Sequence, residues 1–146
     1  MGKMGYDIVV DKLHADELAF SQEALRNYRN VDEIIWHGDL YRLSDPWENP
    51  FAALMYVDER KERAVFFGYL VTNRFDFTFT PNPVKLNGLD PAKKYRLKEL
   101  NVFPGTSAVI DESAVYSGDF LMKAGFNPDV NLMHSSVVVE IKEVKQ

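Results

Sequence analysis

The chain has 146 residues, of which 46% are hydrophobic, and its 17 Lys and Arg against 22 Asp and Glu give a net charge of −5. This is the size of one domain with a core of its own, and the absence of cysteine excludes disulfides and thiolate metal sites. The sequence has no basic stripe for binding nucleic acid and no apolar run long enough to cross a membrane. We therefore expect neither nucleic acid nor a membrane as a partner.

The first part of the chain predicts a strand end followed by one long helix. "DIVV" at 7–10 is an apolar, β-branched run typical of a strand end. From Ala15 to about Asn30, apolar residues recur at helical spacing, with acidic residues in the first turn and arginines in the last, as the helix dipole favours. The wide apolar stripe predicts that this helix lies against another part of the protein.

The rest of the chain has the pattern of an antiparallel β domain. Short strands separated by charged or Gly-, Pro- and Asn-containing turns are predicted at 39–43, 51–57, 64–71, 75–80, 95–100 and 135–144. The segment 102–118 is expected to be a loop with one short strand, and 118–126 a turn of helix ended by Gly125. The fold class is therefore mainly β, an antiparallel β-sandwich of Greek-key type preceded by one long N-terminal α-helix.

The predicted strand at 75–80 alternates strictly, so that three phenylalanines share one face: Phe75, Phe77 and Phe79. We interpret them as core residues or as part of an interdomain contact, in preference to an exposed platform for stacking a sugar.

No pattern for a metal, a cofactor or a nucleophile is found. The three histidines, His14, His37 and His134, lack the spacing of metal ligands, and we interpret them as surface or cap residues. The sequence has no Gly-rich phosphate loop and no G-x-S-x-G elbow. We therefore predict no metal and no cofactor.

Carboxylates need a closer look, because a glycosidase needs only two of them. The candidates are Asp39, Asp45, Glu48, Asp90, Glu99 and Asp119. We assign Asp90 to turn chemistry and Glu99 to the exposed side of its strand. Asp45 and Glu48 flank Trp47 in a Pro-rich corner that could hold a sugar against the indole ring. We favour a corner whose Asp caps the turn and whose Trp closes the core, and keep these three residues as candidate sugar contacts.

Three stretches in order resemble one family: "GDLYRLSDPWENPFAALMYVDERKERAVFFGYL" at 38–70, "LNGLDPAKKYRLKEL" at 86–100 and "YSGDFLMKAGF" at 116–126. They are similar to the C-terminal region of family 36 glycoside hydrolases, the α-galactosidases. The upstream stretch 2–31 is similar to the family's last barrel strand and final helix. The resemblance thus covers nearly the whole chain.

The resemblance implies two parts: 1–36 as the end of the last barrel repeat, a strand end plus a helix, and 37–146 as the C-terminal antiparallel β-sandwich domain. It places Gly2, Met4 and Gly5 at the rim of the last barrel strand. The family's two catalytic aspartates stand on earlier barrel strands, and no residue here matches either one. The resemblance therefore implies no catalytic residue in this chain.

The function expected is that of a non-catalytic C-terminal β-domain of an α-galactosidase-like enzyme, which would hydrolyse terminal α-galactosides with retention. The chain alone is expected to be inactive and to pack on the upstream (β/α)8 catalytic barrel, its main partner; an α-galactoside and a second copy of the chain remain open as further partners. The alternative is a carbohydrate-binding module that uses Trp47 and Trp36. A free-standing sandwich protein is a third reading, and the compartment stays open.

Overall fold

The computed structural model describes residues 4–71, 83–131 and 134–145. Its helical elements are the 3-10 turn η1 (Val10–Lys12), α1 (Ala15–His37) and α2 (Gly118–Lys123). The strands are β1 (Asp39–Ser44), β2 (Phe51–Val57), β3 (Arg63–Leu70), β4 (Lys94–Leu100), β5 (Val115–Ser117) and β6 (Ser136–Glu143). The predicted strand at 75–80, with Phe75, Phe77 and Phe79, lies outside the described residues.

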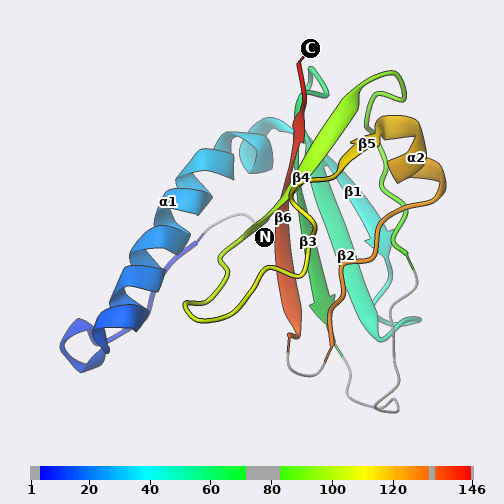
Figure 1. Cartoon of the computed structure of the whole chain (residues 1–146). Helices are drawn as coiled ribbons and strands as arrows, with labels where there is room; N and C mark the ends of the chain where they lie inside the picture. Colours follow the sequence, from blue (N-terminus) through cyan, green and yellow to red (C-terminus); the bar gives the residue numbers. More distant parts are fainter. Residues whose placement is uncertain (1–3, 72–82, 132–133, 146) are drawn as a thin grey trace.

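The strands form one antiparallel sheet in the order β1-β2-β3-β6-β4-β5 (Figure 1). β6, the last strand of the chain, lies between β3 and β4, so the sheet is not a simple meander. The charged turn predicted between β2 and β3 is present, and Asp58 Oδ1 accepts hydrogen bonds from the backbone N–H groups of Glu62 and Arg63. The mainly β, antiparallel fold with one long N-terminal helix is confirmed.

The larger core lies on one face of this sheet. Alternate residues of the strands point into it because side chains of a strand alternate between faces; on β2 they are Phe51, Ala53, Met55 and Val57. In the described residues the layer above this face consists of α2 and the segments that flank it, which contribute Val84, Leu86, Leu89, Ile110, Leu121, Phe126 and Val130. In this layer α2 contacts β5.

Two loops of this layer meet at Gly118, the first residue of α2. A Cβ atom at this position would clash with the backbone carbonyl of Asp90, so only glycine fits. The Gly118 N–H donates to Lys93 O at 2.9 Å, which fixes the start of α2 on the 90–93 turn. The predicted end of the helical turn is also present, because Gly125 has a φ of 83°.

Helix α1 is longer than predicted and runs to His37. The apolar stripe continues through Val31, Ile34 and Ile35, which pack on Val65 and Phe67 of β3 in a second, smaller core. Only this C-terminal part of α1 lies on the sheet, and the N-terminal half projects beyond the strands (Figure 1). The helix therefore stands on the sheet face opposite to the main core.

The prediction of a strand end at 7–10 is not met in the described residues. The backbone at Val9 is extended, but residues 4–9 pair with no strand, and Val10 begins the η1 turn. A strand requires a neighbouring strand to accept its hydrogen bonds, and the described part of the chain supplies none here. Ile8, Val9 and Val10 are all exposed.

Candidate functional site

The corner between β1 and β2 holds the three candidate sugar contacts. Asp45 caps the turn as predicted: its Oδ1 accepts from the Trp47 N–H at 2.9 Å, and its carbonyl accepts from Asn49 N at the same distance. The expectation that Trp47 closes the core is wrong, because its side chain is 94% exposed. The corner turns outward, since Asp45 fixes the local backbone and the core face is already filled by Phe51. A sugar contact at Asp45, Trp47 and Glu48 stays a prediction.

The burial of Glu99 differs from the sequence prediction. The sequence predicts it on the exposed side of its strand, whereas the structure buries it. Counting along β4 gives the reason: Glu99 has the same parity as Tyr95 and Leu97, so it points to the main core. Its Oε2 accepts a 2.7 Å hydrogen bond from Val109 N, which satisfies one side of the carboxylate.

His134 approaches the other side of this carboxylate. Its Nε2 lies 3.1 Å from Glu99 Oε1, a distance typical of an ion pair, although the ring nitrogen is not oriented for a hydrogen bond. His134 is therefore a partner of a buried acid and not the surface residue that the sequence predicts. The other two histidines are exposed as expected: the backbone N–H of His14 donates to Glu17 Oε2 at the start of α1, and His37 lies 3.6 Å from Glu33.

The remaining candidate carboxylates have structural contacts or face solvent. Asp90 forms the predicted turn and accepts from Ala92 N at 2.9 Å. Asp119 pairs with Lys123 across one turn of α2 at 2.7 Å. Asp39 is exposed at the start of β1. Asp90 and Asp119 are therefore engaged in local structural contacts.

Within residues 4–71, 83–131 and 134–145, no group of three or more His, Asp or Glu side chains is placed to hold a metal ion. No helix in the same part of the chain is long and apolar enough to cross a membrane.

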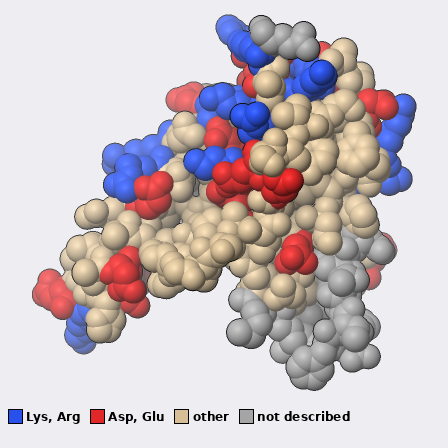
Figure 2. Space-filling view, viewed as in Figure 1, with Lys and Arg blue, Asp and Glu red and all other residues tan. Residues whose placement is uncertain are grey.

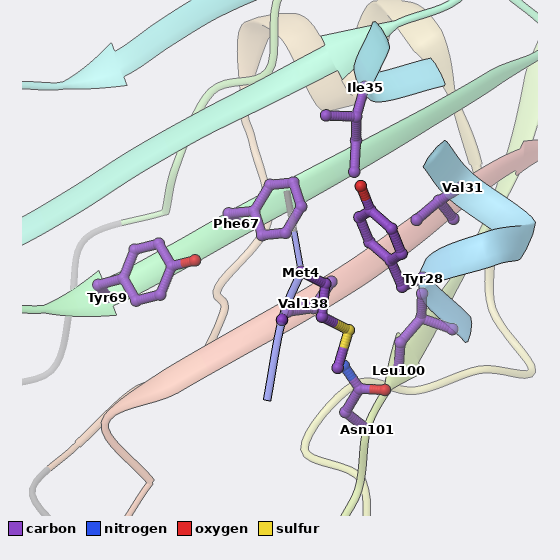
Figure 3. Close-up of a pocket in the computed structure, with 10 residues that line it drawn as sticks. Met4, Tyr28, Val31, Ile35, Phe67, Tyr69, Leu100, Asn101 and Val138 are labelled. Atoms are coloured by element: carbon purple, nitrogen blue, oxygen red, sulfur yellow. The ribbon is translucent and has the colours of Figure 1, made fainter. Parts of the chain in front are cut away.

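An apolar groove of about 320 Å³ lies between α1 and the sheet (Figure 3). It is lined by Tyr28, Val31 and Ile35 from α1, by Phe67, Tyr69, Leu100 and Val138 from the strands, and by Met4, Gly5 and Asn101. None of these side chains is charged. Burial in the groove raises the pKa of Tyr69 to about 12, so its hydroxyl stays neutral at any physiological pH. Such a groove is suited to apolar contact and not to acid–base chemistry.

No pattern in the sequence directly indicates this groove. The sequence predicted that α1 has a wide apolar face, but the groove also needs β3 and β6 to be neighbours, and the insertion of β6 between β3 and β4 is a long-range feature. The alternation of Phe67 and Tyr69 on β3 is the signal that could have indicated a second apolar face of the sheet.

Comparison with known proteins identifies the domain. The model of the glycosyl hydrolase family 36 C-terminal domain matches residues 51–141. Alpha-galactosidase 1 of Pediococcus pentosaceus is 26% identical over 146 residues, which are 99% of this chain and 18% of that protein. Alpha-galactosidase Mel36A of Lactobacillus acidophilus is 32% identical over 125 residues, 86% of this chain and 15% of that protein.

Solved structures agree with this match. The crystal structure of the family 36 α-galactosidase AgaB from Geobacillus stearothermophilus superposes with a TM-score of 0.67 at 26% identity, over 92% of this chain and 17% of that one. An α-galactosidase from Lactobacillus brevis has a TM-score of 0.78 at 18% identity and shares the fold. The chain spans less than a fifth of the length of the relatives that it matches. The chain belongs to the glycosyl hydrolase family 36 C-terminal domain family.

Proposed function

We propose that this chain is the non-catalytic C-terminal β-domain of an α-galactosidase-like glycoside hydrolase and that it packs on and stabilises a catalytic (β/α)8 barrel. One observation carries the proposal: residues 51–141 match the family's C-terminal domain, while the α-galactosidases that match it are more than five times longer. In this proposal the whole enzyme hydrolyses terminal α-galactosides with retention, and the chemistry belongs to the longer part.

The contacts of the candidate acids support a structural role. Retaining glycosidases place two carboxyl groups about 5–5.5 Å apart, one as nucleophile and one as acid and base. Here Asp45 and Asp90 organise turns, Asp119 pairs with Lys123, and Glu99 is buried against His134. Each of the four carboxylates therefore has a use in holding the domain together.

The N-terminal part of the chain supports the same proposal. We infer that residues 1–36 form the end of the last barrel repeat and that α1 is a helix of the barrel's outer ring. The extended backbone before η1 and the N-terminal half of α1, which projects beyond the sheet, are what such an origin would leave in the chain taken alone (Figure 1).

The test is an assay of the purified 146-residue chain with an aryl α-galactoside, with an intact family 36 α-galactosidase as the positive control. We expect no turnover above the blank. Turnover that disappears in Asp45→Asn or Glu48→Gln would place chemistry in this domain and overturn the proposal. Trp47→Ala serves as a control that removes the neighbouring side chain without touching a carboxylate.

A further inference from the structure

One apolar surface of the domain is only partly covered by the described residues. It lies on the α1 side of the sheet and consists of Leu40, Leu54, Tyr56, Phe67, Tyr69 and Val138, which we call the open face. The strand register makes it continuous, because Leu40 pairs with Tyr56, Leu54 with Phe67, and Phe67 with Val138. Four strands therefore contribute to one apolar strip.

Helix α1 covers one margin of the open face, where Met4 and Gly5 also line the groove. Val31, Ile34 and Ile35 pack against Val65, Phe67 and Leu100, whereas Leu54, Tyr56, Tyr69 and Val138 stay half-buried and Leu40 is 41% exposed. The groove of about 320 Å³ runs along this margin, with about ten times the ~30 Å³ that one water occupies in the liquid. A sheet face of this kind is normally buried against another layer.

The charges near the open face are grouped at its borders. Arg63 Nη2 pairs with Glu140 Oε1 at 2.6 Å beyond Val65, and Arg42 lies exposed beside Leu54 in the register. Figure 2 shows charged side chains at the upper end of the molecule and along α1, with uncharged residues between these two groups. The surface has the apolar centre and polar rim of a protein interface.

The chemistry of the groove argues against a hydrophilic small ligand. The polar side chains that line it are Tyr28, Tyr69 and Asn101, and the amide oxygen of Asn101 already accepts from Asn27 at 3.0 Å. Small-molecule sites add several convergent polar or charged groups to an apolar wall, and this wall has no charged one.

The size of the relatives indicates what covers the open face. The chain aligns over 97–99% of its length with α-galactosidases of which it spans only 17–18%, and the matched family is defined as a C-terminal domain. More than four-fifths of those polypeptides therefore lies outside the matched part. A layer that must always be buried is best supplied by the same polypeptide.

We propose that the open face is the docking surface for the polypeptide that precedes this domain and that a helix lies there beside α1, filling the groove. The inference rests on the proposed function, because the outer layer of a (β/α)8 barrel consists of helices. Neighbouring helices pack 8–10 Å apart, so a helix adjacent to α1 would lie over Phe67, Tyr69 and Val138.

The experiment uses the intact polypeptide encoded by the same reading frame. A photo-reactive residue replaces Leu40 (Leu40→p-benzoylphenylalanine) in one variant and Val115 in the matched control. Leu40 and Val115 are 41% and 43% exposed and both stand on edge strands, but only Leu40 belongs to the open face. After illumination, peptide mass spectrometry identifies the partner of each cross-link.

We expect an intramolecular cross-link from position 40 to an upstream peptide and none from position 115. A cross-link between two copies, or no cross-link at position 40, would overturn the inference. Hydroxyl-radical labelling of the unmodified polypeptide gives a second measurement, in which Tyr56 and Tyr69 should be labelled several-fold less than in the 146-residue chain, while Trp47 is unchanged. If each tyrosine is labelled equally in the intact polypeptide and in the 146-residue chain, the inference is also overturned.

The α-galactoside assay separates the two proposals. An intact polypeptide that hydrolyses the substrate but gives no cross-link at position 40 contradicts only the docking surface. A reading frame without an upstream catalytic part contradicts the proposed function and the docking surface together.

Discussion

The hydroxyl group of Tyr95 joins two loops that are far apart in the sequence. It accepts a hydrogen bond from Asp90 N at 3.0 Å and donates one to Lys61 O at 2.8 Å, and the side chain is fully buried. Burial raises its pKa, so the hydroxyl remains a donor. Tyr95 thus ties the 90–93 turn to the β2–β3 hairpin.

Replacing Tyr95 by Phe should lower the free energy of unfolding by about 1–3 kcal/mol. The ring would still fill the core, but the part-buried Asp90 N–H would lose its partner, and the Lys61 carbonyl would keep only the Lys93 ammonium group at 3.5 Å. Urea denaturation of the 146-residue chain measures the change. Tyr116→Phe is the matched control. The Tyr116 ring stacks on Phe120 with 5.7 Å between the ring centroids, and this contact does not need the hydroxyl group. Equal effects of the two substitutions would refute the role of Tyr95.

For single residues, the sequence predicted which side chains hold turns better than it predicted which side chains are buried. Asp45 and Asp90 were expected to hold turns, and both do, because an Asp side chain bonds the backbone two residues on whatever the rest of the fold is. The positions of Glu99 and Trp47 depend on which layer covers each side of the sheet. A buried acid with a histidine partner 35 residues away has no local signature.

Helix α1 shows what periodicity can and cannot predict. The apolar spacing identified the helix and its start near Ala15, but its end was expected at about Asn30 rather than His37. The last two turns are stabilised by packing of Ile34 and Ile35 on the sheet, a tertiary contact that overrides a weak local signal. The short strand β5 likewise exists because β4 offers a partner.

The two halves of α1 should differ in stability in the chain alone. Backbone amides of residues 19–23 should exchange with deuterium markedly faster than those of 31–35, since the buried contacts with the strands come from the C-terminal half. Hydrogen exchange followed by mass spectrometry measures this difference. Uniform protection along the helix would mean that the N-terminal half has a cover that the described contacts do not include.

In the intact polypeptide the difference in exchange rate between the two halves of α1 should become smaller. If residues 15–30 belong to a barrel's outer ring, the slow exchange should extend to the N-terminal half of α1. Exchange at the rate of the chain alone would contradict the assignment of residues 1–36 to the last barrel repeat.

At the scale of the whole molecule, composition and strand spacing were sufficient to predict a mainly β domain with one helix. They did not predict the position of β6 between β3 and β4, because strand order depends on contacts between residues more than 70 positions apart, such as Phe66 with Val139. The open face follows from that order. The ordered motifs linked the chain to its family, and the family match confirms this.

The central claim is that this domain works as the C-terminal part of a larger glycoside hydrolase, and the mass of the native polypeptide tests it most directly. Mass spectrometry of the protein from its source, detected through peptides of 51–141, should give a chain more than five times heavier than 16.8 kDa, in line with relatives of which this chain spans 18%. A native polypeptide of 16.8 kDa would contradict the account, and α1 and the open face would then need another partner.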